Sequence, residues 1–161
     1  KKKVFFRPTH CYYCHMLLSN KKARLNYEIL ETFSAGMKLL GFEVKSLKEK
    51  KGSLEGAHIT VRGDEAFVLN MFIPPYQAAN TPKDYDPYRN RKLLLTKKEI
   101  ATLQGHEAQK GLTIVPISVY NKGRNLKIDI AVARGKKKYD KREDLKKRTA
   151  KRDIERSLKY E

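Results

Sequence analysis

The sequence predicts a mainly β domain with short helices, followed by a basic C-terminal segment that favours a helix. Apolar and polar residues alternate over short stretches bounded by Gly, Asn, Asp and Pro, which is typical of antiparallel strands. Two other stretches carry apolar residues at helical spacing. The chain has 161 residues, which fits one domain with appendages. We therefore divide it into a basic extension over residues 1–19, a barrel over residues 20–133 and a basic tail over residues 134–161.

The extension over residues 1–19 is predicted to be disordered or artefactual. It holds both cysteines, so the core is expected to depend on no disulfide. The range Cys11–His15 reads CYYCH and matches the C-x-x-C-H pattern of c-type haem attachment, while His10 makes a zinc cluster imaginable. Four ligands within six residues would crowd around one ion, and no export signal precedes them. We therefore expect no metal and no haem here, and a natural start at Met16.

The first elements of the barrel are a strand and a helix. The strand begins near Tyr27 and is expected to break at Gly36. The spacing of apolar residues then becomes helical between Met37 and Lys51, and Gly52 is a plausible cap. A basic stretch over residues 20–24 precedes both elements.

A hairpin is predicted next, with strands over 54–61 and 66–73 and a turn over 62–65. Two prolines end the second strand. Residues 74–91 are rich in Pro, Asn, Asp and Tyr and have no periodicity. A loop this long in a compact domain is usually functional or disordered.

The chain returns to the core at residues 93–95. Thr96 and Glu99 form a capping box, which predicts a helix that ends near Gly105 or Gly111.

The last hairpin is predicted from strands over 112–120 and 126–133, with Pro116 marking a bulge or an edge. The order strand, helix, two strands, loop, helix, two strands fits a small barrel, closed or partly closed. We expect an OB-like antiparallel barrel. Such barrels often bind nucleic acid, although that step is an analogy from fold.

The formal net charge is +18, which predicts a polyanionic partner, with nucleic acid ahead of an anionic membrane. No apolar run is long enough to span a bilayer, so we expect a cytoplasmic protein. No catalytic constellation or phosphate-binding glycine loop is present, so we expect no enzyme activity and no cofactor. His58 stands alone and is expected to be structural or exposed. The cations expected to contact phosphates are Lys21, Lys22, Arg24, Lys45, Lys48, Arg89, Arg91 and Lys92.

Three tyrosines of the long loop lie close to these cations in the sequence. Tyr76, Tyr85 and Tyr88 have two interpretations, stacking on exposed bases or packing within the loop.

The tail carries 13 Lys/Arg and 6 Asp/Glu. Ala150, Ile154 and Leu158 fall four apart and line one narrow helical stripe. Arg148, Arg152 and Arg156 form a second stripe at the same spacing. The segment favours a helix but buries too little to fold firmly by itself. A passive solvated helix is the alternative.

From Asn20 to Tyr160 the chain resembles the SsrA-binding protein family, also called small protein B. The resemblance rests on segments that follow one another in order: 20–24 (NKKAR), 41–47 (GFEVKSL), 86–87 (DP), Arg89, 91–95 (RKLLL), 99–100 (EI), 111–113 (GLT), 135–137 (GKK) and 139–142 (YDKR).

The resemblance implies a partner of transfer-messenger RNA in trans-translation, the rescue of stalled ribosomes. The barrel would grip the tRNA-like domain of that RNA as a monomer, and Leu94 is expected at the same surface. The tail would enter the vacant mRNA path beside small-subunit rRNA and become helical when bound. The tail residues expected to act there are Gly135, Lys136, Lys137, Lys138, Tyr139, Asp140, Lys141, Arg142, Arg148, Arg152, Ile154, Arg156 and Leu158.

The chain departs from the family at three places. Ser34 stands where many members have Glu, Tyr139 stands where some have His, and the Cys11–Cys14 segment has no counterpart. Two other functions are kept as alternatives. One is a general RNA-binding or ribosome-associated protein without specificity for transfer-messenger RNA, and the other is a redox or haem protein based on CYYCH.

Overall fold

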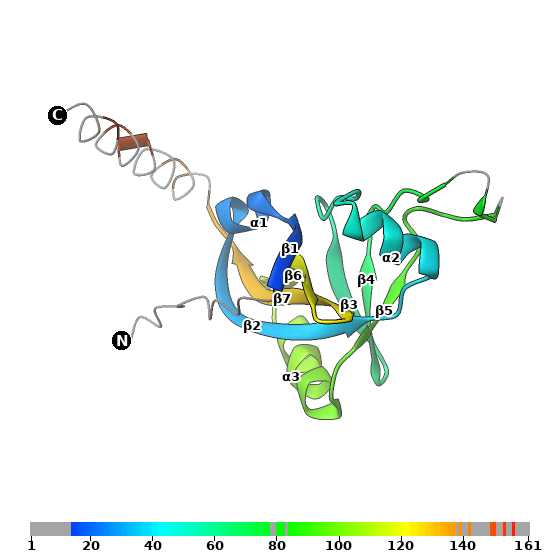
Figure 1. Cartoon of the computed structure of the whole chain (residues 1–161). Coiled ribbons are helices and arrows are strands. Elements are labelled where there is room, and N and C mark those ends of the chain that lie inside the picture. The colour runs from blue at the N-terminus through cyan, green and yellow to red at the C-terminus, as the bar shows by residue number, and fades with distance from the viewer. Residues whose placement is uncertain are drawn as a thin grey trace.

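The computed structural model describes residues 14–77, 80–82 and 84–137, together with residues 139, 142, 149, 150, 153 and 156. The described strands form one antiparallel sheet with a few short helices against it, which confirms the mainly β prediction (Figure 1). Within these ranges, no helix is long and apolar enough to cross a membrane.

Seven strands and three helices follow one another along the described chain. They are β1 (Cys14–Ser19), α1 (Lys21–Asn26), β2 (Tyr27–Met37), α2 (Gly41–Lys48), β3 (His58–Arg62), β4 (Glu65–Leu69), β5 (Arg91–Leu94), α3 (Lys97–Glu107), β6 (Leu112–Lys122) and β7 (Asn125–Gly135).

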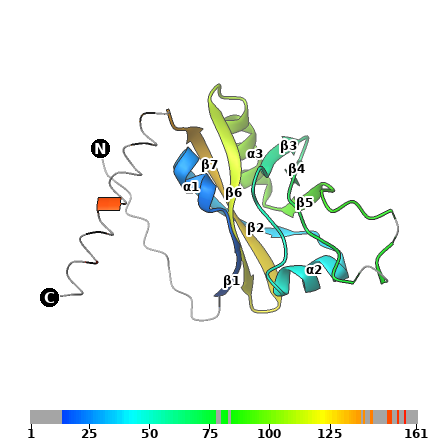
Figure 2. The ribbon, with the colours of Figure 1, turned by 90° about the horizontal axis from the view of Figure 1, so that it is seen from above.

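The strand order closes the sheet into a barrel. The order is β1-β6-β3-β4-β5-β2-β7, and β6 also pairs with β7. Six strands therefore form a ring, with β1 as an additional strand on β6. The figures show α1 and α2 on one side of this ring and α3 on the other (Figures 1 and 2).

Alternating side chains fill the barrel. In β7, Ile128 and Ile130 are fully buried, while Lys127 and Asp129, which alternate with them, are only partly buried, as the sequence predicts. The helices add Leu47 from α2 and Leu103 from α3 to the same core. Burial of apolar surface from all sides of the ring thus fixes the strand register.

The sheet begins earlier than expected, because β1 includes residues 14–19 of the predicted extension. Cys14 pairs with Lys122 and Ser19 pairs with Ser118. Leu18 is buried in the core. The first boundary of the predicted domains therefore shifts toward the N-terminus, and residues 1–13 lie outside the described part of the chain.

The helix α1 was not predicted, because only Ala23 among its six residues is buried. Asn20 caps it: its side-chain oxygen accepts a hydrogen bond from the Ala23 N–H at 3.0 Å. The amide nitrogen of Asn20 donates to the carbonyl oxygens of Leu54 and Pro116, at 3.1 and 3.2 Å. A single buried asparagine therefore attaches α1 to the barrel.

Several boundaries differ from the prediction. β2 continues through Gly36, whose missing side chain leaves room for Leu94: a Cβ there would lie 3.3 Å from the Leu94 Cβ. α3 begins after its Thr96 cap as predicted and continues past Gly105. Pro116 lies at a bulge, which was one of the two predictions for this residue. The other prediction, an edge strand, is wrong because β6 has three partner strands.

Candidate nucleic-acid interface

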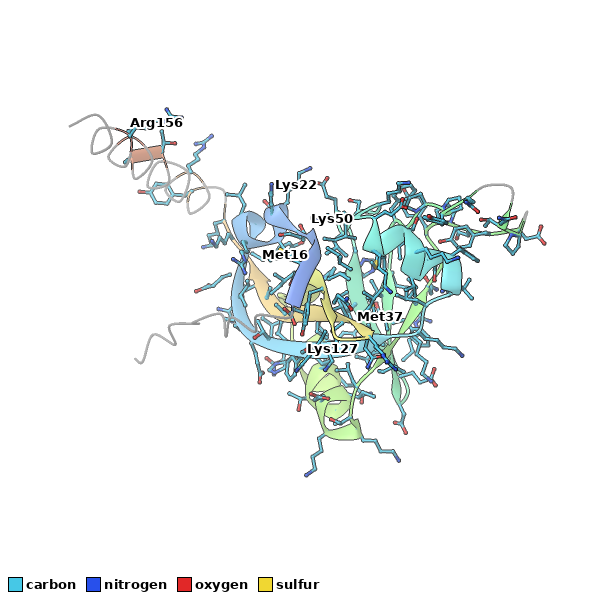
Figure 3. The ribbon with its side chains drawn as sticks, viewed as in Figure 1. Met16, Lys22, Met37, Lys50, Lys127 and Arg156 are labelled. Carbon is cyan, nitrogen blue, oxygen red and sulfur yellow. The ribbon has the colours of Figure 1, made fainter. Side chains whose placement is uncertain are left out.

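The helix α1 presents three predicted cations from one side of the barrel. Lys21, Lys22 and Arg24 are all exposed, and Lys22 projects from α1 away from the barrel (Figure 3). The Lys22 ammonium lies 2.7 Å from the Glu55 carboxylate. Both side chains are more than half exposed, so this ion pair is weak and open to exchange with a phosphate.

The tail leaves the barrel beside α1. Gly135 at the end of β7 pairs with Tyr27, and the Lys136 N–H donates to the Asn26 carbonyl at 2.9 Å. The Lys136 ammonium lies 3.5 Å from the Arg24 carbonyl oxygen. The fold therefore brings together two groups of predicted cations, from α1 and from the root of the tail, which are far apart in the sequence.

A row of five paired residues crosses the outer surface of the barrel. Each residue pairs with the next, in the order Leu94 (β5), Gly36 (β2), Lys127 (β7), Tyr120 (β6) and Met16 (β1). We call this set the cross-strand row. Leu94 and Met16 at its ends are large apolar side chains that are 57% and 60% exposed.

Hydroxyl groups lie beside the cross-strand row. The Ser34 hydroxyl is 2.7 Å from the Tyr120 hydroxyl, and the Ser118 hydroxyl donates to the Asp129 carboxylate at 3.1 Å. Of the row, sequence reasoning included only Leu94, because strand alternation identifies the outer face but does not show which strands become neighbours.

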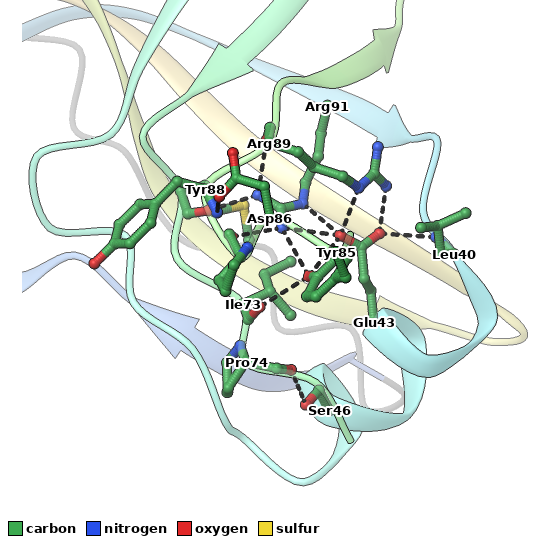
Figure 4. Close-up of polar contacts among 12 residues, drawn as sticks. Leu40, Glu43, Ser46, Ile73, Pro74, Tyr85, Asp86, Tyr88, Arg89 and Arg91 are labelled. Atoms are coloured by element: carbon green, nitrogen blue, oxygen red, sulfur yellow. Dashed lines mark hydrogen bonds and ion pairs between the residues drawn. The ribbon is translucent and has the colours of Figure 1, made fainter. Parts of the chain in front are cut away.

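The structure corrects the prediction for Arg91, because this side chain is completely buried. Its Nε donates to Glu43 at 3.0 Å, and its two Nη atoms donate to the carbonyl oxygens of Met71 and Pro87 at 2.5 and 2.9 Å (Figure 4). With no exposed surface and its donors engaged, Arg91 cannot contact a phosphate in this fold. The predicted phosphate contact at Arg91 is therefore wrong, and its charge serves the interior.

The buried carboxylate of Glu43 is the centre of this network. Arg89 approaches it with Nε at 2.9 Å and Nη2 at 2.5 Å, and the Tyr85 hydroxyl donates to it at 3.1 Å. Burial alone raises the pKa of the Glu43 carboxyl, but hydrogen bonds from Arg89 and the Leu40 N–H, with the Arg91 and Arg89 charges, outweigh it and lower the pKa below its usual range. Burial, with the charge of Glu43 adding to it, raises the pKa of Tyr85.

The Glu43 network tethers the long loop to α2. The Tyr85 hydroxyl, whose single proton is shared between two acceptors, also lies 2.9 Å from the Ile73 carbonyl oxygen, and the Ser46 hydroxyl donates to the Pro74 carbonyl at 2.6 Å (Figure 4). Loop packing is therefore the interpretation that the structure supports for Tyr85. Arg89 is only partly exposed and directs most of its donors to Glu43, so its phosphate contact stays a prediction.

The remaining barrel cations stay predictions. Lys92 forms an ion pair with Glu65, Lys45 lies 5.8 Å from the centre of the Tyr76 ring, and Lys48 is exposed at the end of α2.

The described residues of the tail beyond Lys137 are helical and exposed. Tyr139 is 68% exposed, and Arg156 lies 4.0 Å from Asp153. Arg142 is also described. The predicted tail residues Lys138, Asp140, Lys141, Arg148, Arg152, Ile154 and Leu158 lie outside the described side chains, as do the side chains of the CYYCH motif.

Comparison with known proteins gives a consistent result. The model of the SmpB protein family matches residues 17–160. The chain belongs to the SmpB protein family. The SsrA-binding proteins of Microcystis aeruginosa and Gloeobacter violaceus are each 49% identical over 144 residues, which is 89% of this chain and 94% of each relative. That of Clostridium kluyveri is 49% identical over 143 residues, covering 89% of this chain and 90% of the relative.

A solved structure extends the match to three dimensions. A chain from "tmRNA-SmpB: a journey to the center of the bacterial ribosome" is 43% identical, with a TM-score of 0.64 over 75% of this chain and 85% of that chain. The SmpB family match includes α1, the cross-strand row from Leu94 to Tyr120 and the tail root. Met16 at the end of the row lies one residue before the matched range.

Proposed function

We propose that this protein binds transfer-messenger RNA and acts in trans-translation. It binds the tRNA-like domain of the RNA and helps to deliver it to stalled ribosomes. The observation that carries this proposal is the family membership over residues 17–160, together with the likeness to an SmpB chain from a tmRNA–ribosome structure. A protein with this role works where ribosomes are, in the cytoplasm, and its task is binding rather than catalysis.

The barrel over residues 20–133 is proposed as the RNA-binding unit, with β1 as an additional strand on β6. Its outer surface offers apolar contact from the cross-strand row and cations from α1 and the neighbouring strands. Lys and Arg hold phosphates, while aromatic and apolar side chains contact bases and sugars. The proposed contacts are Lys21, Lys22, Arg24, Lys45, Lys48, Arg89, Lys92 and Leu94, and the row adds Tyr120 and Lys127.

The tail over residues 134–161 is proposed to occupy the empty mRNA path and the decoding centre. Its root is anchored at Asn26, beside the cations of α1. A helix that is marginal in solution becomes ordered against rRNA phosphates, so the entropy of ordering is lost only at binding. This makes the step conditional on a channel without mRNA. Residues 135–142 would lie at the decoding centre and the remainder along the path.

Sequencing the RNA that co-purifies with the tagged protein from bacterial cells tests the proposal. We expect transfer-messenger RNA to be strongly enriched over ordinary tRNA and over rRNA. Competition of the two RNAs for the purified protein provides the quantitative form of the same test. Equal affinity for both would favour the alternative, a general RNA-binding protein without this specificity.

A further inference from the structure

A small cavity lies between α2 and the loop that follows β4. It has a volume of about 300 Å³. It is lined by Gly41, Phe42 and Lys45 of α2 and by Tyr76, Gln77 and Asn80 of the loop. These residues are not part of the cross-strand row, α1 or the tail. Of them, Lys45 was predicted to contact a phosphate, and Tyr76 had base stacking as one of its two interpretations.

One lining side chain, Phe42, packs against the Glu43 network, and the loop backbone on the other side is bonded to α2. The Phe42 ring meets the Tyr85 ring edge-on, with centroids 4.8 Å apart and planes at 88°. Tyr85 is fixed in turn by its hydroxyl group, which shares its one proton between Glu43 and the Ile73 carbonyl oxygen, at 3.1 and 2.9 Å. On the loop side, the bond from Ser46 to Pro74 holds the chain against α2 just before Tyr76. The cavity is therefore a pre-organised feature of the fold.

The chemistry of the lining matches that of a nucleotide. Two aromatic rings are available, and the ammonium groups of Lys45 and Lys51 lie 5.8 and 5.9 Å from the centre of the Tyr76 ring. The side-chain amides of Gln77 and Asn80 are hydrogen-bonded to each other at 2.7 Å, and amides can recognise the polar edge of a base. Cations beside aromatic rings are the combination with which proteins bind single-stranded nucleic acid.

We propose that this cavity binds one unstacked nucleotide of an RNA, a proposal that rests on the RNA-binding function given above. The base packs against Tyr76 and Phe42. The Lys45 ammonium moves away from the Tyr76 ring and pairs with the phosphate. The neighbouring Lys51 ammonium also attracts this phosphate. Gln77 and Asn80 face the edge of the base. The nucleotide comes from an unpaired position of transfer-messenger RNA or of ribosomal RNA, since both offer the same chemistry.

A variant that fills the cavity tests the proposal without removing any of its side chains. Gly41 lines the cavity and a Cβ there would meet no atom within 4 Å, so Gly41→Leu adds bulk beside the cavity with no clash at its Cβ. Gly105→Leu is the matched control, because Gly105 lies in α3 and a Cβ there also meets no atom within 4 Å. We expect Gly41→Leu to weaken RNA binding by about tenfold, the loss typical of one stacked base, and Gly105→Leu to leave it unchanged.

Ultraviolet crosslinking locates the nucleotide and identifies its source. Wild-type protein is irradiated in one arm with transfer-messenger RNA alone and in the other with that RNA and ribosomes. Mass spectrometry should find a nucleotide on Tyr76 or Phe42 in at least one arm, and this adduct should be lost in Gly41→Leu. The arm in which it appears identifies the RNA.

The two hypotheses fail in different ways. Crosslinks confined to other residues in both arms, with RNA affinity equal in Gly41→Leu and Gly105→Leu, would overturn the cavity proposal and leave the RNA-binding function intact. Wild-type protein that bound neither transfer-messenger RNA nor ribosomes would overturn the proposed function and this inference with it. Thermal unfolding of both variants shows that a loss of binding is not a loss of fold.

Discussion

The Glu43 network and the α1 surface use the same residue types in opposite ways. In the network, the Arg91 guanidinium and the Glu43 carboxylate are fully buried and saturated with hydrogen bonds. At the α1 surface, Lys22 of α1 forms an ion pair with Glu55, and both side chains are more than half exposed. A buried pair is costly to break from one side, whereas an exposed pair contributes little and exchanges easily. The first kind of cation therefore builds the fold, and the second is available to an RNA.

The largest effect is expected from removing the tail, which leaves the buried network intact. A chain that ends at Gly135 keeps all of β7, including the pair between Gly135 and Tyr27. We expect it to fold with near wild-type stability and to bind transfer-messenger RNA, but to fail almost completely in the rescue of stalled ribosomes. A reconstituted rescue reaction, together with a binding assay on the same protein, provides the measurement. Normal rescue by the tail-less protein would assign the tail the passive role.

Replacing the buried carboxylate of Glu43 should destabilise the fold far more than removing the tail. In Glu43→Gln the Arg91 charge stays buried without its counter-charge, which costs roughly 3–5 kcal/mol. Glu55→Gln is the matched control on the exposed pair, with an expected change below about 1 kcal/mol. Urea unfolding of the two variants measures the difference. If both lost the same stability, the distinction between the two kinds of cation would not hold.

The pH dependence of stability should differ between wild type and Glu43→Gln. The folded pKa of Glu43 lies below its ordinary value of 4.5, so its contribution is fully present above that value and is lost as the pH falls through the folded pKa. The stability gap between the two proteins should therefore be constant near neutral pH and shrink below about pH 4.5. Urea unfolding as a function of pH measures it. A gap that stayed constant at low pH would show that the Glu43 charge is not its source.

Sequence patterns located most strands but could not separate these two uses of a charge. Alternation predicted β7, the hairpin pattern predicted its partner β6, and the capping box predicted the start of α3 at Thr96, because all three signals are local. Arg91 gave no such signal, because its burial depends on Glu43, 48 residues away in the sequence. α1 was missed for a related reason: its one buried residue, Ala23, gives no period, although Asn20 is a favourable cap.

The α1 cations should account for part of the salt dependence of RNA binding. We expect Lys22→Glu combined with Arg24→Glu to weaken binding and to reduce the log–log salt slope by roughly 0.7–0.9 for each lost phosphate contact. Lys97→Glu with Lys98→Glu changes the net charge equally on α3, at the other side of the barrel. Binding curves at several salt concentrations separate the two double variants. Equal slopes would show that only net charge matters and would place the RNA elsewhere.

The smallest change in RNA affinity is expected at the exposed ion pair of Lys22 and Glu55. The direction of this change is more informative than its size. Glu55 competes with RNA phosphate for the Lys22 ammonium, 2.7 Å away, so its removal should strengthen RNA binding. Because an exposed pair is worth ~0.2–1 kcal/mol, Glu55→Gln should raise the affinity by about 1.4- to fivefold. Asp64→Asn in the exposed turn between β3 and β4 removes the same charge without touching α1, and it should change the affinity less. A binding assay at low salt resolves the difference, since screening removes it at high salt. If Glu55→Gln weakened binding instead, then Glu55 would position Lys22 for the RNA, and the exposed pair would resemble the buried network after all.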